Sequence, residues 1–510
     1  MYKRKAIAIA IAAGMLALAG CSGGGEGVDL GDSASGDSGV LRAAIGGEPD
    51  QLDPHRTSSY FSFQVLENIF DTLVQPDENL EMQPALAESW QVSDDQLTWT
   101  FTLRDGVTFH DGSDFTADDV VYSYNRIIDE ELANAWKFAA VTEVSAVDDS
   151  TVKITVAQPT PNLLSNLGGF KGMAIVDQAN VESGDIQTAP IGTGPFSFAD
   201  AVSADSISLT ANPDYWGGAP EVGGIEFQFI SEASTALAAL RSGEIDWTDV
   251  IPEQEVEQLQ EDESISVEVS PSNDYWYLAL NQAREPWSDV RVRQAIAYAV
   301  DREAIVQAVS YGTAQQNQLA IPEDSVWYTE YDSYSRNLDK AKQLLSDAGV
   351  TGGTMDMLAT SDYPETVKAA QIIASNLEPL GFTVNIRQPD FSTWLDEQNS
   401  GNFDILMMGW LGNIDPDDFY YAQHHSEGAS NAQKYANASV DELLDAGRVE
   451  TDMAARKQLY ADAATIIADE ASYIYLYNPA VIQAWNPVLT GYDVRADAAI
   501  RFQDAVLTEQ

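Results

Sequence analysis

The residues best suited to bind a small molecule follow an apolar segment at 403–410, FDILMMGW, which we predict to be a buried strand. Ligands of open α/β folds bind beyond the carboxyl ends of such strands. An indole stacks on a ligand with little loss of entropy, an amide hydrogen-bonds an amine, and a carboxylate also neutralises it. We therefore predict that Trp410, Asn413 and Asp415 contact a ligand, with plain core packing as the alternative for Trp410.

Asp415 has a second role open to it, because it begins the sequence Asp-Pro-Asp-Asp. An aspartate followed by proline is a favourable helix start, in which the carboxylate caps the first turn and the proline lies within it. The sequence alone leaves both the cap and the ligand contact open for Asp415.

Patterns typical of catalysis or metal binding are scarce. The chain has four histidines, and it contains neither a Gly-x-Ser-x-Gly elbow nor a His-Glu-x-x-His helix. His424 and His425 are adjacent, and adjacent side chains on a helix or strand point apart, so such pairs seldom bind one ion together. We expect no catalytic residue, no metal and no cofactor. A secreted hydrolase remains the alternative class, and the lack of repeats disfavours an adhesive surface protein.

The N-terminus has the features of an export signal. A basic start precedes an apolar run at 6–19, which is too short to span a bilayer, so we predict a signal peptide at 1–20. The run ends in Leu-Ala-Gly-Cys, which resembles a lipobox and implies lipidation of Cys21, the only cysteine of the chain. Residues 21–39 are rich in Gly and Ser and are expected to be a flexible, lipid-anchored tether.

The composition sets the scale of the protein and excludes one class of partner. A chain of 510 residues corresponds to roughly three domains of about 150 residues each. Its net charge of -54 would repel phosphate backbones, so nucleic acid is not an expected partner. The acidity fits either a high-salt habitat or a need for solubility outside the cell, and composition does not separate these.

One stretch has an especially clear pattern of predicted secondary structure. Thr98–Leu103 alternates large apolar residues with threonines, which predicts a strand with one buried face. Two Asp-Gly turns follow, and Thr116 with Asp119 three residues later forms a capping pair that predicts a helix.

This stretch resembles the signature of the family 5 solute-binding proteins, the peptide- and nickel-binding receptors of bacterial ABC importers. The motifs that carry the resemblance are LAESW at 86–90, LRDGVTFHDG at 103–112, FTADDVVYS at 115–123, PIGTGPF at 190–196 and NPDYWGG at 212–218. The resemblance implies an α/β fold of the periplasmic-binding-protein type (class II, cluster C), with two α/β lobes, a hinge and an extra domain. The implied division is 40–70, 189–268 and 482–510 for the first lobe, 71–188 for the extra domain, and 269–481 for the second lobe.

The resemblance also implies a receptor that captures short peptides, di- or oligopeptides, between its lobes. It would deliver them to an ABC permease that works with a cytoplasmic ATPase. Oligosaccharides are the alternative ligand, followed by a nickel complex or haem. We expect an extracytoplasmic monomer, held to the membrane only by the lipid on Cys21.

Further binding residues are expected on other segments. In peptide-binding members of the family, an aspartate three residues after the tryptophan receives the α-ammonium of the peptide, and this chain has Asn413 there. Tyr60 and Phe61 follow the loop EPDQLDPH and are expected either in the pocket wall or packed beneath that loop. Tyr275 and Trp276, at the start of a predicted strand, are further candidates.

Overall fold

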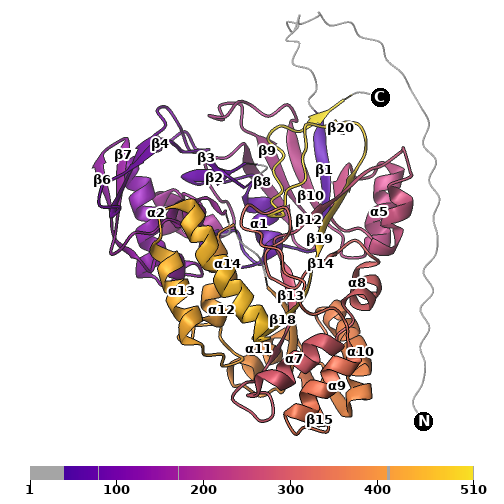
Figure 1. Ribbon diagram of the computed structural model, residues 1–510. Helices are drawn as coiled ribbons and strands as arrows, with labels where there is room; N and C mark the ends of the chain where they lie inside the picture. The colour runs from indigo at the N-terminus through magenta and orange to yellow at the C-terminus, as the bar shows by residue number, and fades with distance from the viewer. Residues whose placement is uncertain (1–38, 78–79, 171, 411–413, 509–510) are drawn as a thin grey trace, which may run out of the picture. The chain divides into compact units, whose positions relative to one another are not determined.

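The computed structural model describes residues 39–77, 80–170, 172–410 and 414–508 (Figure 1). The predicted signal peptide, Cys21 and all but the last residue of the predicted tether lie outside the described residues, and so does Asn413. The chain folds around β-sheets that are covered by helices, which is the layered α/β arrangement that the sequence predicts.

A seven-stranded sheet in the described part of the chain gathers segments that lie far apart in the sequence. β1 is parallel to its neighbours β10 and β11, and the other pairs are antiparallel. The helix α1 (Tyr60–Leu66) packs its buried face into the core on this sheet. The strands, in spatial order, are β12 (Ser266–Pro271), β19 (Ala480–Trp485), β11 (Trp247–Thr248), β1 (Val40–Ile45), β10 (Gly224–Phe229), β9 (Ser206–Ala211) and β8 (Phe196–Val202). The helices α5 (Ala233–Ser242), η3 (Glu253–Glu255) and α6 (Val256–Leu259) lie between β10 and β12 along the chain.

A four-stranded antiparallel sheet contains the strand that the sequence predicts at 98–103. β5 (Thr98–Leu103) buries Trp99, Phe101 and Leu103 on one face, as its alternation predicts. The predicted helix is also confirmed, because α2 (Ala117–Asp129) starts with a capping box between Thr116 and Asp119. The sheet has the order β4 (Ala87–Val92), β5, β7 (Thr151–Val156) and β6 (Val141–Asp148). Residues of β2 (Val74–Pro76), β3 (Met82–Pro84), η1 (Ala135–Phe138) and α3 (Leu163–Gly168) pack in the same core. The next elements along the chain, α4 (Gln178–Ser183) and η2 (Asp185–Gln187), pack Val181 and Ile186 against the core on the seven-stranded sheet.

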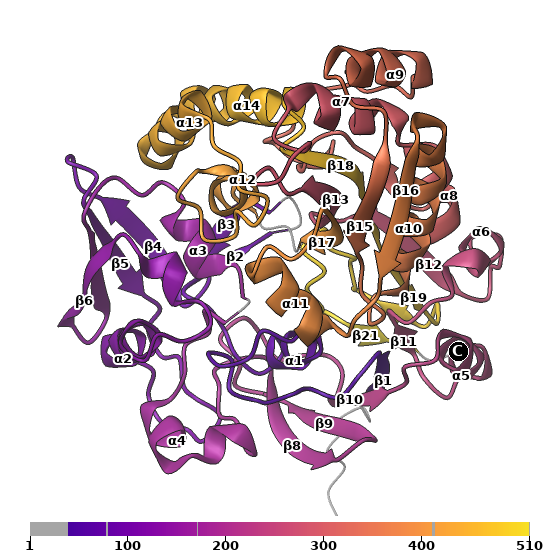
Figure 2. The same ribbon diagram turned by 90° about the horizontal axis from the view of Figure 1, so that it is seen from below.

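A six-stranded mixed sheet has helices on both faces. Figure 2 shows α8, α9 and α10 on one side of it and α11 and α12 on the other, and a separate apolar core lies on each face. The strands, in spatial order, are β14 (Gln315–Gln316), β18 (Tyr473–Asn478), β13 (Tyr275–Leu280), β17 (Ile405–Trp410), β15 (Gly353–Leu358) and β16 (Phe382–Arg387). The helices on one face are α7 (Val290–Ala299), α8 (Arg302–Ser310), α9 (Leu338–Asp347) and α10 (Pro364–Leu377), which continues into η4 (Glu378–Leu380). Those on the other face are α11 (Phe391–Asn399), α12 (Pro416–His424), α13 (Ala438–Val449) and α14 (Met453–Asp469). A short ribbon of β20 (Leu489–Thr490) and β21 (Val506–Leu507) completes the strands.

Short connections at 272–274 and at Pro479 lead between the seven-stranded and six-stranded sheets (Figure 1). They lie side by side, because the Ser272 amide donates to the Pro479 carbonyl at 3.0 Å. Adjacent short links of this kind are typical of hinges. The domain boundaries stay a prediction, and those at 268/269 and 481/482 fall within β12 and β19, two strands that pair with each other.

Candidate functional site

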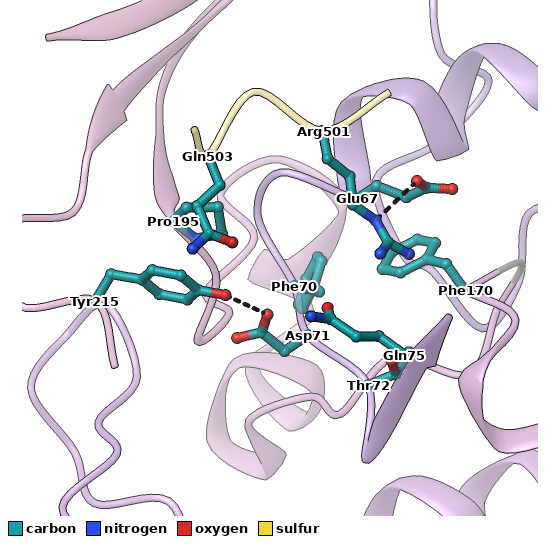
Figure 3. A pocket seen from close by; sticks show the side chains of 10 residues that line it. All are labelled: Glu67, Phe70, Asp71, Thr72, Gln75, Phe170, Pro195, Tyr215, Arg501 and Gln503. Atoms are coloured by element: carbon teal, nitrogen blue, oxygen red, sulfur yellow. Dashed lines mark hydrogen bonds and ion pairs between the residues drawn. The ribbon is translucent and has the colours of Figure 1, made fainter. Parts of the chain in front are cut away.

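Two hollows in the described residues do not coincide with the predicted binding residues. The first has a volume of about 20 Å³ and surrounds Asp71 (Figure 3). The Asp71 carboxylate accepts hydrogen bonds from Thr193, Tyr215 and Trp216, and burial raises its pKa. A cavity of this volume holds about one water molecule and no peptide. The second, of about 460 Å³, lies between α9 and η4 and has Lys342 as its only charged lining residue.

Trp276 and Trp410 lie at one edge of the six-stranded sheet, next to the connections to the seven-stranded sheet. β13 begins and β17 ends at this edge, where Trp276 pairs with Gly409 and Tyr275 with Trp410. The Trp276 ring stacks on Tyr477 with a centroid separation of 6.1 Å, and it covers Gly409 so closely that a Cβ there would lie 2.8 Å from the indole. Trp276 and Trp410 are both half-buried, which leaves part of each ring accessible to a ligand.

Tyr275 does not share this accessibility, which corrects the expectation that it contacts a ligand. Its side chain is 1 % exposed and packs in the core between Phe419 and Tyr475, with ring centroids 5.9 and 5.5 Å away. Both faces of β13 are covered: Tyr275 is part of one apolar core, and Trp276 packs against the edges of both. Tyr275 is therefore not a proposed ligand contact.

Asp415 caps helix α12 by accepting a hydrogen bond from the Asp417 amide, so the predicted cap is confirmed. Its two carboxylate oxygens also form two hydrogen bonds of 2.6 Å with the guanidinium of Arg456 on α14. Asp415 is 3 % exposed and Arg456 is 3 % exposed. The carboxylate is thus fully used within the protein, which favours the cap over a ligand contact.

His424 is the last residue of α12 and His425 is the residue after the helix, and the two have different partners. Both ring nitrogens of the buried His424 hydrogen-bond within the protein, to the Ser472 and Tyr475 hydroxyls at 2.9 Å. His425 stacks on Tyr421 with a centroid separation of 4.5 Å. Their positions are explained by packing.

Tyr60 and Phe61 begin helix α1 and differ in their surroundings. The half-buried ring of Phe61 lies on the backbone of Gly46 and Gly47, where a Cβ on Gly47 would approach it to 2.8 Å, so this ring packs beneath the loop after β1. Tyr60 is 38 % exposed, and its hydroxyl donates to the Ala498 carbonyl at 3.4 Å. Tyr60 is therefore the more accessible of the pair.

Acidic groups from several segments surround Tyr60. Burial raises the pKa of Tyr60 well above 10, and the negative charges of Asp249, Glu67 and Asp274 add to the effect. Asp249 follows β11, and burial raises its pKa to about 6. Asp274 belongs to the connection between β12 and β13. Tyr60 therefore lies near the joint between the two large sheets, in a region of negative potential.

A second acidic group lies where η3 approaches α10. Burial raises the pKa of Glu253 on η3, and the charge of Glu365 on α10 adds to this, while Lys368 opposes it. Burial likewise raises the pKa of Tyr477, and the charges of Glu365 and Glu253 contribute. Glu253 belongs to the part of the chain around the seven-stranded sheet, and Glu365 and Tyr477 belong to the part around the six-stranded sheet. Tyr477 in turn stacks on Trp276. Asp249, Glu253 and Glu365 could not be recognised from the sequence, because their proximity depends on tertiary structure.

Together these residues outline a candidate site at the strand ends where the two large sheets approach each other. Aromatic side chains supply flat apolar surfaces, and carboxylates supply hydrogen-bond acceptors. The accessible residues are Tyr60 and Asp249 from the seven-stranded part, and Trp276, Glu365 and Trp410 from the six-stranded part. Two buried residues support them: Gln64 donates a hydrogen bond to Asp249, and Tyr477 stacks on Trp276. This set can hold a polar, partly apolar molecule by stacking and hydrogen bonding.

Asp418 lies on α12, the helix that follows β17, and its pKa can be tested. Burial raises its pKa to about 7; the charges of Asp415 and Asp417 add to this, and those of Lys137 and Arg456 oppose it. An unfolded aspartate has a pKa of about 4, so the folded protein holds an extra proton between about pH 4 and 7. The stability due to this proton is complete below about pH 4 and is lost as the pH rises through 7.

We therefore expect Asp418→Asn to be more favourable for stability, relative to the wild type, at pH 8 than at pH 5.5. The variant mimics the protonated carboxyl at every pH, so its advantage over the wild type should grow by about 1 to 2 kcal/mol between the two pH values. Urea unfolding at both pH values measures this difference. Asp339→Asn on the exposed face of α9 is the control, and an equal pH dependence in both variants would contradict the account.

Comparisons with known proteins concern the family and the fold of this chain. Residues 81–431 match the model of the bacterial extracellular solute-binding proteins, family 5, middle part. A glutathione-binding protein of Pectobacterium atrosepticum, GsiB, is 27 % identical over 481 residues, covering 91 % of this chain and 94 % of the relative. A probable D,D-dipeptide-binding periplasmic protein of Escherichia coli, DdpA, is 28 % identical, covering 87 % of this chain and 89 % of its own.

A solved structure shows the same fold. The ABC transporter-associated periplasmic binding protein DppA of Helicobacter pylori, in complex with the peptide STSA, superposes with a TM-score of 0.80 at 29 % identity. The match covers 92 % of this chain and 98 % of that one. The predicted two-lobed fold class is thereby confirmed. Within the part of the chain that is described, every helix is too short or too polar to cross a lipid bilayer.

Proposed function

The chain belongs to the bacterial extracellular solute-binding proteins of family 5, and from this we propose that it captures a short peptide for an ABC importer. The observation that carries the proposal is the likeness, over nearly the full length of both chains, to a binding protein solved with the peptide STSA. The named relatives that bind glutathione or a dipeptide support the same ligand class. The partner would be a membrane permease with a cytoplasmic ATPase.

Capture in this proposal needs no bond to be made or broken. The two large sheets are joined by the short links at 272–274 and at Pro479, which suit a hinge. A ligand that contacts both parts stabilises the closed arrangement in proportion to its preference for that arrangement. The permease would then recognise the closed, loaded receptor. The protein would act as a monomer.

The peptide would lie extended between the two parts. Its main chain would be held by hydrogen bonds, and its side chains would occupy hydrated, tolerant pockets. Trp410, Trp276 and Tyr60 are proposed as contacts because each is partly exposed near the joint. Asn413 also remains proposed, although it lies outside the described residues, and Phe61 would support the wall from beneath the loop.

The attachment to the membrane is part of the same proposal. Cleavage after residue 20 would leave Cys21 as a lipidated N-terminus, followed by a tether rich in Gly and Ser. The receptor would then stay outside the cytoplasm and close to its permease. A variant Cys21→Ser that is released into the medium instead of the membrane fraction would support this anchoring.

Trp410→Ala is expected to weaken peptide binding at least tenfold, a loss of about 1.4 kcal/mol. The reason is the removal of a flat, half-buried surface at the end of β17. Isothermal titration calorimetry measures the change. The exposed Trp136→Ala is a matched control, because Trp136 is 55 % exposed on η1 and is not a proposed contact. Unchanged affinity in a folded Trp410→Ala variant would remove Trp410 from the site.

Calorimetry against peptide and oligosaccharide mixtures tests the proposed ligand class. We expect stoichiometric binding of peptides and no binding of oligosaccharides. Tight binding of an oligosaccharide alone would favour that alternative ligand. Accumulation of a cleaved product would favour a secreted hydrolase and contradict the proposal.

A further inference from the structure

Gln64 and Asp249 form a hydrogen-bonded pair in which two buried acceptor atoms have no partner. Gln64 of α1 is 2 % exposed, and its Nε2 donates to Asp249 Oδ2 at 2.5 Å. The remaining oxygens, Gln64 Oε1 and Asp249 Oδ1, are buried and have no hydrogen-bond partner among the described residues. Leaving a buried acceptor unpaired costs about 1–3 kcal/mol. Each of these two acceptors can take a further hydrogen bond, either from a ligand or from water.

The surrounding charges favour a cationic donor over a neutral one. Asp249 forms no ion pair among the residues that the structure describes. Asp249, Glu67 and Asp274 all act on neighbouring Tyr60 as negative charges. One nearby cation, Arg501, lies 3.7 Å from Glu67 and is engaged with that carboxylate. A carboxylate without a counter-ion in a poorly solvated place binds an ammonium group strongly, because the pair compensates for the lost hydration of both charges.

The pair is also placed where a ligand can reach it. Tyr60, one turn before Gln64 on α1, is 38 % exposed, and Asp249 itself is only half-buried. Tyr60 is close enough to Asp249 to hydrogen-bond with its carboxylate. A small shift of the Tyr60 side chain would therefore open the carboxylate to an incoming amine.

We propose that Asp249, assisted by Gln64 and Tyr60, receives the cationic amino group of the ligand. This inference rests on the proposed function and specifies it, since it assigns the charged end of the ligand to the seven-stranded part of the protein. The ligand class it selects is a peptide with a free ammonium group. Neutral sugars and amino-blocked peptides would leave the two acceptors unpaired.

The test compares one tetrapeptide, Ser-Thr-Ser-Ala, with its N-acetylated form, using calorimetry on the whole protein. The wild type is expected to bind the free amine at least tenfold more tightly than the acetylated peptide. In Asp249→Asn the two dissociation constants should agree within about threefold, because the amide cannot neutralise the ammonium. Glu257→Gln, which removes an exposed charge from α6, should keep the wild-type preference.

The outcomes separate this inference from the proposed function. If the wild type binds both peptides equally, the inference fails, but the proposed function as a peptide receptor is still supported. This outcome needs only the wild-type protein, so it does not depend on whether a variant folds. If Asp249→Asn retains the full preference, the amine is received elsewhere and the buried pair is completed by water. If neither peptide nor any other short peptide binds the wild type, the proposed function fails and the inference fails with it.

Discussion

Arg456→Met is expected to lower the free energy of unfolding by about 3–5 kcal/mol, which is the usual cost of removing one partner from a buried ion pair. The change leaves the Asp415 carboxylate buried without its two hydrogen bonds of 2.6 Å. It also removes the bond from Arg456 Nε to the Gly447 carbonyl at 2.8 Å. Methionine keeps much of the apolar volume, so the loss should arise mainly from the unpaired charge. Urea unfolding measures it.

Arg241→Met provides the matched control on the surface. Arg241 lies 3.6 Å from Glu255, and both side chains are more than a third exposed. Exposed pairs of this kind contribute at most about 1 kcal/mol. Equal losses in the two variants would contradict our account of how Asp415 is held at the start of α12. They would also remove the argument that Arg456 occupies the Asp415 carboxylate and keeps it from a ligand.

Asn478→Ala should lower the free energy of unfolding by about 3 kcal/mol, because Asn478 ties together the segments at the proposed hinge. Its Nδ2 donates to the carbonyls of Asp274 and Ala320, each at 2.8 Å, and its Oδ1 accepts from Asn317 at 2.8 Å. Asn478 is fully buried, so truncation leaves three polar groups unpaired, at about 1–3 kcal/mol for each group that stays dry. Thermal unfolding with calorimetric detection measures the loss.

Asn385→Ala is the control for this second change. Asn385 is exposed on β16, and its single hydrogen bond to Asp356 is 3.3 Å long. Exposed substitutions of this kind usually change stability by less than about 0.5 kcal/mol. A loss below 1 kcal/mol for Asn478→Ala would mean that the joint between the sheets does not depend on this side chain.

Local patterns predicted the elements whose determinants lie close together in the sequence. The alternation in Thr98–Leu103 and the capping pair Thr116 with Asp119 involve only near neighbours, and both features are present. The cap at Asp415 follows from the proline beside it. The motifs between residues 86 and 218 predicted the fold class, because several of them occur in the same order as in a family of known fold.

The site was less predictable because its determinants are distant in the sequence. Alternation shows that Tyr275 and Trp276 face opposite sides of β13, yet it does not show that helices cover both sides. Asp415 could not be paired with Arg456 from the sequence, since 41 positions separate them. Asp249 and Gln64 are 185 positions apart, and they meet because β11 pairs with β1 and α1 packs on the same sheet.

The most direct test of the central claim is mass spectrometry of what the protein retains after incubation with a peptide mixture and removal of unbound solute. We predict that about one peptide per chain is retained and that every released peptide has the mass of an added one. Retention of no small solute, or recovery of cleaved peptides that the unincubated mixture lacks, would contradict the view that this chain captures peptides without altering them.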